Sequence, residues 1–241
     1  MTLSKIKTSN NLVFYTREGT SDQKTIIEVI EQKAYQRMDF KIEPGSNWLD
    51  LGGNIGAFTV LAASLGADVT VYEPDPYNCE MISKNLAING LSANVVNEAL
   101  IHDDRKELIL FIGNNNQFWR NSLVKKWNNK GIKVKCSNFF DVYGSFSNCK
   151  MDIEGSEMLI LEKMVTKQDT IFNQLVFEWS FDIDSSIPRL HKLLMGLHKY
   201  YILLNPELEK LERYMKRNIY KWEFARACTT VFLKGRNDNG N

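Results

Sequence analysis

A glycine-rich turn that follows a short apolar segment is the feature that most constrains the fold. The turn reads Asp50-Leu51-Gly52-Gly53-Asn54-Ile55-Gly56, and the small and apolar residues after it predict a helix over 55–65. Glycine adopts positive φ and lets a ligand approach the backbone closely. A strand, a glycine-rich turn and a helix in this order are typical of parallel sheets that bind ligands beyond the carboxyl ends of their strands. The D-x-G-x-N-x-G order differs from the dinucleotide G-x-G-x-x-G order, so the turn alone does not identify the ligand.

The rest of the chain alternates between segments typical of strands and of helices. Strands are predicted at 48–51, 69–73, 93–96, 107–112, 149–153, 174–179, 200–204 and 224–234. Helices are predicted at 24–38, 55–65, 76–89, 156–164 and 185–199. This alternation predicts an α/β fold with a mainly parallel, doubly wound sheet and helices on both faces. We expect residues 1–45 to form a helical and strand extension packed on the core, 46–235 the main domain, and 236–241 a disordered tail.

The composition of the chain excludes few functions, but its charge balance argues against some classes of binding partner. The 241 residues include 30 basic and 29 acidic side chains, a formal net charge of +1, which gives no electrostatic case for nucleic acid or an anionic membrane as the main partner. The four cysteines form no C-x-x-C pair, so no zinc or redox site is indicated. The N-terminus lacks an apolar signal core, and no apolar run is long enough to span a bilayer. A cytoplasmic protein is therefore expected, while its oligomeric state stays open.

The second predicted strand ends in an acidic residue, Glu73, followed by Pro74. A carboxylate at that position can accept hydrogen bonds from both ribose hydroxyls of an adenosyl ligand, and its charge disfavours a 2′-phosphate. The sequence has no Walker lysine, which argues against an ATPase that grips phosphates. The turn and Glu73 together therefore indicate an adenosyl ligand.

A third motif, Lys150 to Glu157, closes a later strand with three carboxylates, those of Asp152, Glu154 and Glu157. At the carboxyl edge of the sheet one of them could act as a general base for a hydroxyl, hold the ligand's amino group, or bind a divalent ion. Alternatively, Ser156 and Glu157 only cap the next helix. We expect a catalytic Asp152 and a partly capping Glu157. Glu178 ends the next strand and is a second catalytic candidate; no pattern demands a metal ion.

The least regular segment, 113–133, is rich in amides and includes Phe118, Trp119 and Arg120. Amides suit sugar hydroxyls and aromatic rings suit the apolar faces of sugars, so we expect this loop to cover the acceptor, with Glu154 and Trp179 as further contacts. The alternative is a surface loop whose Phe118 and Trp119 pack on the core.

Together these motifs resemble the FkbM family of methyltransferases, with the match running from about Ile27 to about Glu178. The resemblance implies a Rossmann-like, seven-stranded methyltransferase sheet, S-adenosylmethionine as donor, and an acceptor hydroxyl on a sugar, glycan or similar small metabolite. It implies that the glycine-rich turn lines the methionine part of the donor, Glu73 the ribose and residues 97–99 the adenine. The donor contacts implied are Asp50, Gly52, Gly53, Asn54, Gly56, Glu73, Pro74, Asn97, Glu98, Ala99 and Asp152. Gly53 stands where the family more often has alanine.

Two other functions remain open at this point. A nucleic-acid methyltransferase that acts on amino groups usually has an Asn/Asp-Pro-Pro-aromatic turn, where this chain has Asp152-Ile153-Glu154-Gly155. The second alternative is a methyltransferase-like subunit that binds the donor without catalysis. Both the donor-side and the reaction-side motifs are present, which favours the enzyme.

Overall fold

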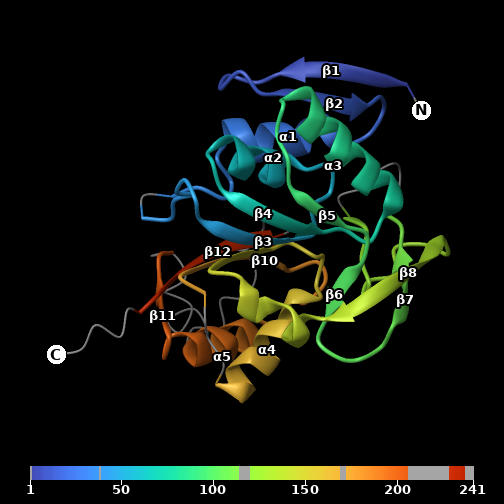
Figure 1. Ribbon diagram of the computed structural model, residues 1–241. Helices are drawn as coiled ribbons and strands as arrows, with labels where there is room; N and C mark the ends of the chain where they lie inside the picture. The colour runs from blue at the N-terminus through green and yellow to red at the C-terminus, as the bar shows by residue number, and fades with distance from the viewer. Residues whose placement is uncertain (1, 38, 114–119, 169–171, 206–227, 237–241) are drawn as a thin grey trace.

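The computed structural model describes residues 2–37, 39–113, 120–168, 172–205 and 228–236 (Figure 1). Its centre is a seven-stranded sheet in the order β11-β12-β10-β9-β3-β4-β5. The bounds are β3 Asn47–Leu51, β4 Asp68–Tyr72, β5 Asn94–Val96, β9 Asn148–Met151, β10 Gln174–Ser180, β11 Tyr201–Leu203 and β12 Cys228–Gly235. All pairs from β5 to β10 are parallel, and β12 runs antiparallel to both of its neighbours. The predicted doubly wound, mainly parallel α/β sheet is confirmed.

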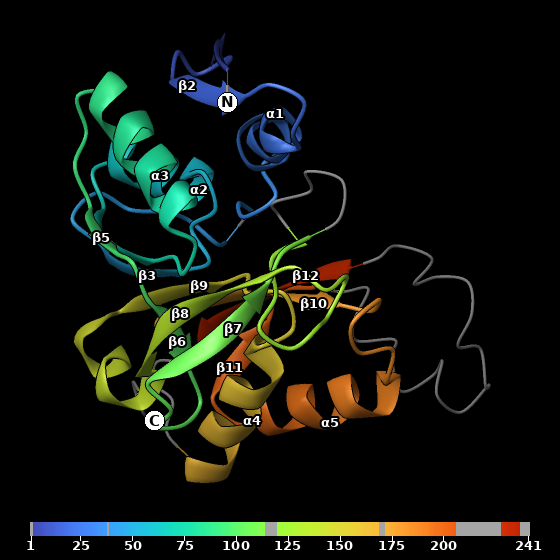
Figure 2. The same cartoon turned by 90° about the vertical axis from the view of Figure 1, so that its right-hand side faces the viewer.

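Helices cover both faces of this sheet (Figures 1 and 2). One face carries α1 (Asp22–Ile26) with its π-helical continuation η1 (Ile27–Glu31), α2 (Ala57–Ser64) and α3 (Pro76–Ile88). The other face carries α4 (Glu157–Lys167) and α5 (Ile187–Leu197). Because both faces are covered, the central strands are buried on both sides, as in β3, where the last four of its five residues are buried. Two hydrophobic clusters, one on each face, form the core.

Two smaller sheets flank the core. An antiparallel hairpin of β1 (Leu3–Lys7) and β2 (Val13–Arg17) packs against α3, where Asn85 and Asn89 bind the backbone of β2. A three-stranded sheet in the order β6-β8-β7 comprises β6 Ala99–Ile101, β7 Glu107–Phe111 and β8 Gly131–Asn138. The short 3-10 turns η3 (Phe139–Asp141) and η4 (Tyr143–Ser145) lead from β8 into β9.

The structure corrects several predicted boundaries. The helix predicted over 24–38 ends at Glu31, because Lys33 has a φ of 55° that a right-handed helix cannot contain. The strand predicted over 107–112 pairs with β8 outside the main sheet. The segment 113–133 was predicted to be irregular, but its last residues begin β8, whose alternating Ile132, Val134 and Cys136 are a period-two strand signal. Residues 224–227 of the last predicted strand and 237–241 of the predicted tail lie outside the described part of the chain.

Candidate active site

The carboxyl ends of β3, β4, β9 and β10 border one cavity of about 220 Å³. Parallel strands bring their carboxyl ends to the same edge, so motifs about a hundred residues apart in the chain meet there. Nine of the sequence-predicted site residues line it: Gly52, Gly53, Asn54, Glu73, Pro74, Ala99, Asp152, Glu154 and Glu178. The cavity therefore joins the glycine-rich turn, the acidic end of β4 and the third motif.

The glycine-rich turn is fixed by close backbone contacts. Gly52 has a φ of 79°, and a Cβ atom there would lie 1.9 Å from the carbonyl oxygen of Asp152. A Cβ at Gly53 would lie 2.3 Å from Val71 Cγ2, so the glycine that departs from the family pattern suits its neighbours in this chain. The backbones of the turn and of the third motif are therefore in contact, so the residues predicted to bind the donor lie beside those predicted to be catalytic.

Glu73 is buried and its carboxylate is held in place by the turn. Oε2 accepts a hydrogen bond from the Asn54 backbone N–H at 2.8 Å, and Oε1 accepts one from the Asp75 N–H at 2.9 Å. Burial raises the pKa of Glu73 to about 7, against the lowering effect of these hydrogen bonds. Asn54 Oδ1 is buried and has no hydrogen-bond partner among the described residues. Both residues line the cavity.

Asp50 lies behind the turn instead of lining the cavity. It is fully buried, forms an ion pair with Lys150 at 3.0 Å and accepts a hydrogen bond from Thr59 Oγ1 at 2.7 Å. Lys150 Nζ also donates to the Gly52 carbonyl oxygen at 2.7 Å. Burial lowers the pKa of Lys150, but the charges of Asp50 and Asp152 more than offset this, and the net pKa is raised. The buried pair anchors β3 to β9 directly below the cavity.

Asp152 is placed by a residue that the sequence did not single out. The Tyr35 hydroxyl donates a hydrogen bond of 2.6 Å to Asp152 Oδ2, across 117 positions of the chain. Burial, together with the charges of Asp152 and Glu178, raises the pKa of Tyr35 well above its usual value, so the phenol stays a donor. No local motif identifies Tyr35, because it acts only through the contact that the fold creates.

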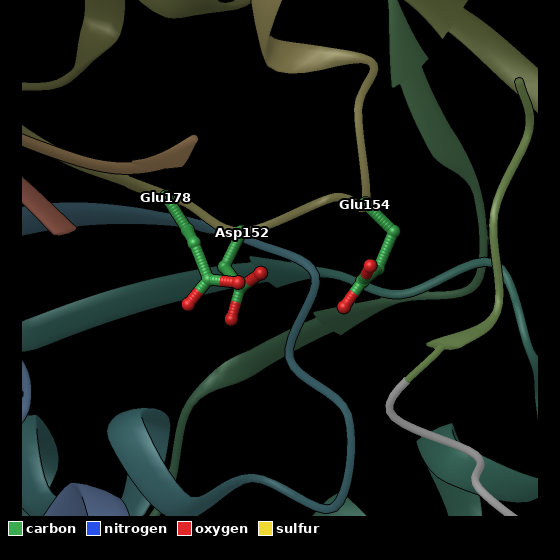
Figure 3. Close-up of side chains that lie close together, drawn as sticks. All are labelled: Asp152, Glu154 and Glu178. Carbon is green, nitrogen blue, oxygen red and sulfur yellow. The ribbon is translucent and has the colours of Figure 1, made fainter. Parts of the chain in front are cut away.

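Glu154 and Glu178 complete an acidic cluster with Asp152, drawn in Figure 3. One carboxylate oxygen from each residue lies within 4.8 Å of the others. Burial and the negative charge of Asp152 raise the pKa values of Glu154 and Glu178 well above the usual range. The structure thus crowds three carboxylates at one side of the cavity.

Glu157 was expected to cap α4 in part, but its carboxylate instead binds the backbone of the turn before this helix. Its Oε1 accepts from the Ile153 N–H at 2.5 Å and its Oε2 from the Gly155 N–H at 2.7 Å, so it fixes the turn before α4. Ser156 makes no side-chain cap. Burial and the charge of Asp152 raise the pKa of Glu157 to about 8.

The remaining predicted residues lie apart from the cavity lining. Gly56 caps α2 against Ile82, and Glu98 accepts from Ser137 Oγ. Asn97 donates to the carbonyl oxygens of Glu73 and Pro74, which holds the end of β4 from behind.

Trp179, predicted as an acceptor wall, is 1% exposed and packs in the core. Successive strand residues face opposite sides, so Glu178 reaches the cavity while Trp179 turns away from it. Arg120 pairs with Asp182, a lining residue, at 3.2 Å. Phe118 and Trp119 lie outside the described residues.

Lining residues beyond those predicted come from the N-terminal helix and the last strand. Glu28 and Val29 lie on η1 and Cys228 begins β12, and no motif singles these three out. Asn121 and Leu123 also line the cavity, and they belong to the segment 113–133 that was expected to cover the acceptor. The apolar helix periodicity around Val29 predicts burial but not its place at a site. Among the described helices, none has both the length and the apolar character needed to cross a membrane.

Comparison with known proteins identifies the family. The doubly wound sheet with a cavity at its carboxyl edge defines a ligand-binding α/β protein, and the family model described as the methyltransferase FkbM domain matches residues 50–221. That range is more than half of the chain, so the chain belongs to the FkbM methyltransferase family. A search of curated proteins gives no match.

Solved structures with a similar arrangement include several methyltransferases. The Pyrococcus abyssi tRNA (uracil-54, C5)-methyltransferase in complex with S-adenosyl-L-homocysteine has a TM-score of 0.47 and 10% identity over 84% of this chain and 39% of that one. An rRNA methylase from Streptococcus thermophilus has a TM-score of 0.44 and 11% identity, covering 80% and 88%. StiE O-MT has a TM-score of 0.42 and 9% identity, covering 92% and 75%. The chain spans well under half the length of the first of these proteins.

Proposed function

We propose that the protein is an O-methyltransferase that methylates a hydroxyl group of a sugar, glycan or similar small metabolite. One observation carries the proposal: the carboxylate of Asp152, oriented by Tyr35, borders the same cavity as Gly52 and Glu73. A candidate base and a candidate donor site thus share one enclosed space. Such an arrangement suits an acceptor that must lose a proton as it is methylated.

The residues around Glu73 fit the adenosyl donor. Glu73 Oε2 accepts one backbone hydrogen bond, from Asn54, and a carboxylate oxygen has room for a second donor such as a ribose hydroxyl. The buried, unpartnered Asn54 Oδ1 needs a donor, which the hydroxyl or ammonium groups of S-adenosylmethionine would provide. Gly52 and Gly53 keep the turn free of side chains. We therefore assign the donor to the side of the cavity formed by the turn and Glu73.

Methyl transfer from this arrangement needs few protein groups. When bound, S-adenosylmethionine supplies a methyl group on a positively charged sulfur. Asp152 takes the proton of the acceptor hydroxyl while the oxygen forms its bond to the methyl carbon and the carbon–sulfur bond breaks. Tyr35 keeps the Asp152 carboxylate oriented by its 2.6 Å hydrogen bond. Holding both partners in one cavity is itself worth several kcal/mol, on the order of 5 or more, relative to free encounter.

The charge of the cavity favours a neutral or cationic acceptor over a polyanion. Its lining includes the carboxylates of Glu28, Asp152, Glu154, Glu178 and Asp182, against the ammonium groups of Lys24 and Lys150. Phosphate groups approaching this edge would be repelled, and the formal net charge of +1 offers no compensating excess of basic residues. A sugar hydroxyl meets no such barrier, and the carboxylates offer it hydrogen-bond acceptors.

The test is a methyl-release assay with a panel of acceptors. Purified protein is incubated with labelled S-adenosylmethionine and sugars, glycans, other hydroxylated metabolites, amines and RNA, and the labelled product is located by mass spectrometry. We expect label on a hydroxyl oxygen of a non-nucleic-acid acceptor and a sharp loss of turnover in Asp152→Asn. Label on an RNA base or an amine nitrogen would overturn the proposal, and so would full turnover in Asp152→Asn.

A further inference from the structure

The acidic cluster of Asp152, Glu154 and Glu178 brings together three residues from two elements of the sheet edge. Asp152 and Glu154 follow β9, and Glu178 lies in β10, which pairs with β9 in parallel. One oxygen from each residue lies within 4.8 Å of the others. Figure 3 shows the three side chains directed into the same space. Carboxyl groups so close together cannot all be charged at low cost, so either some of them keep a proton or a cation lies between them.

The side chain of Glu154 is the most telling member of this cluster. It is 8% exposed, and no described residue donates a hydrogen bond to its carboxylate. The neighbouring Glu157 is 1% exposed, yet both of its oxygens accept hydrogen bonds from backbone N–H groups. Burying a carboxylate without partners is costly, so buried acids in proteins are normally paired or bound to a metal ion. Glu154 therefore points to a ligand that the protein itself does not supply.

The basic side chains around the cluster have other partners. Lys150 is paired with Asp50 at 3.0 Å, and Arg120 with Asp182 at 3.2 Å. Among the described residues, no ion pair involves Asp152, Glu154 or Glu178. Glu178 Oε1 accepts a long hydrogen bond of 3.5 Å from Ser180 Oγ. The thiol of Cys228 is the other hydrogen-bond partner of the Glu178 carboxylate. The charge of Lys150 reaches Asp152 through space, but no described basic side chain forms an ion pair with any of the three carboxyl groups.

We propose that Asp152, Glu154 and Glu178 bind one oxygen-preferring divalent cation, of the class of Mg²⁺, Mn²⁺ and Ca²⁺. Such ions bind carboxylate oxygens at roughly 2.0–2.6 Å, so two ligands on opposite sides of an ion lie about 4–5 Å apart. The spacing of up to 4.8 Å in the cluster falls in this range. A set of carboxylates without histidine or cysteine favours these hard ions over zinc or copper.

The three ligands leave coordination positions open, because these ions take about six to eight oxygen ligands. An acceptor hydroxyl in the cavity can fill one of them, and coordination to a divalent cation lowers the pKa of a bound hydroxyl or water. Coordination of the acceptor hydroxyl by the cation rests on the proposed function, whereas binding of the cation to the three carboxylates does not. If both hold, the acidic side of the cavity selects acceptors that present an oxygen ligand, such as a sugar with neighbouring hydroxyls.

The cation site is tested with the metal alone. The full chain is stripped of metal with a chelator, desalted and titrated with Mn²⁺, and the free ion is followed by electron paramagnetic resonance. We expect one Mn²⁺ per chain, displaced by Mg²⁺ or Ca²⁺, and affinity at least tenfold weaker in Glu154→Gln. The matched control is Glu80→Gln, an exposed carboxylate on α3 paired with Lys84, which should bind like the wild type. Thermal unfolding of each variant confirms that it is folded.

Either of two results would overturn the site: a folded wild type that binds no Mn²⁺ at millimolar concentration, or equal affinity in wild type and Glu154→Gln. The acceptor panel is run in parallel with and without Mg²⁺. Binding of Mn²⁺ without transfer to any hydroxyl would overturn the proposed function and leave the cation site standing. Methyl transfer to a hydroxyl without Mn²⁺ binding would overturn the cation site and leave the proposed function standing.

Discussion

Glu73 and Glu154 are both buried carboxylates at the edge of one cavity, but their surroundings differ. Each oxygen of Glu73 accepts a backbone hydrogen bond, from Asn54 and from Asp75. The carboxylate of Glu154 accepts none from the described residues and faces Asp152 and Glu178. A carboxylate fixed by backbone donors has a set position before any ligand arrives, which suits recognition of one invariant molecule. A crowded and unpaired carboxylate instead needs a ligand to complete it.

This contrast divides the cavity into two halves. The half that we propose for the donor, called the donor half, is formed by the turn from Gly52 to Asn54 with Glu73, and the acidic half by Asp152, Glu154 and Glu178. The backbone contact between Gly52 and Asp152, and the pair of Asp50 with Lys150, hold the halves together. Substitutions in the two halves should therefore change different measured quantities.

The largest effect is expected in the acidic half. Asp152→Asn keeps the shape of the side chain and an oxygen for the Tyr35 hydroxyl but removes the negative charge, so turnover should fall by about 100-fold to 10,000-fold. The rate of methyl transfer to the acceptor found in the panel measures this, with Asp103→Asn, a surface residue paired with Arg105, as control. A rate within about threefold of wild type, the size of an ordinary context effect, would remove Asp152 from the chemistry.

The next largest effect concerns the connection between the halves. Lys150→Met removes the partner of the fully buried Asp50 and leaves an uncompensated charge, which should lower the free energy of unfolding by about 3–5 kcal/mol. Urea unfolding measures the change. Lys84→Met breaks an exposed pair with Glu80 and should cost about 0.5 kcal/mol or less. Equal losses in the two variants would mean that the buried pair does not hold the sheet edge together.

A smaller effect is expected in the donor half. Glu73→Gln replaces one acceptor oxygen with an NH₂ group, so one of the two backbone N–H groups loses its partner and the ribose loses an acceptor. The dissociation constant for S-adenosylhomocysteine should rise about tenfold to 100-fold, which is about 1.4–2.7 kcal/mol. Isothermal calorimetry measures it against Glu80→Gln. Unchanged affinity would move the donor away from Glu73.

The smallest effect is the dependence of stability on pH. The folded-state pKa values, about 7 for Glu73 and about 8 for Glu157, lie above the ordinary glutamate value of 4.5. Their contribution is therefore full below about pH 4.5 and is lost as pH rises through 7 and 8. Between pH 5.5 and 8.5 the free energy of unfolding should fall as pH rises, with a flatter slope in Glu157→Gln. Urea unfolding in chelator at constant ionic strength tests this, and a rise with pH would contradict it.

Much of the fold and of the donor half could be predicted because their determinants are local. The turn at Gly52 and the carboxylates of Glu73 and Asp152 each end a strand, and parallel strands bring such ends together without further information. The π-helical end of the first helix and the N-terminal hairpin were not predicted, since they depend on the φ of Lys33 and on contacts with Asn85 and Asn89.

The residues that could not be predicted act across long sequence separations. Tyr35 matters only because its hydroxyl meets Asp152, and Lys150 only because β9 lies beside Asp50 in β3. Trp179 was placed at the acceptor because it follows Glu178, but the alternation of the strand turns it into the core. Sequence position indicates which residues reach the sheet edge, while the direction of each side chain requires the register of the strands.

The division of the cavity into two halves is tested most directly by one set of titrations with S-adenosylhomocysteine. Calorimetry on wild type, Glu73→Gln and Asp152→Asn compares the halves without an acceptor, and the neutral sulfur of this ligand avoids a charge effect from Asp152. We predict at least about tenfold weaker binding in Glu73→Gln and affinity within about twofold of wild type in Asp152→Asn. Equal weakening in both variants, or none in Glu73→Gln, would contradict it.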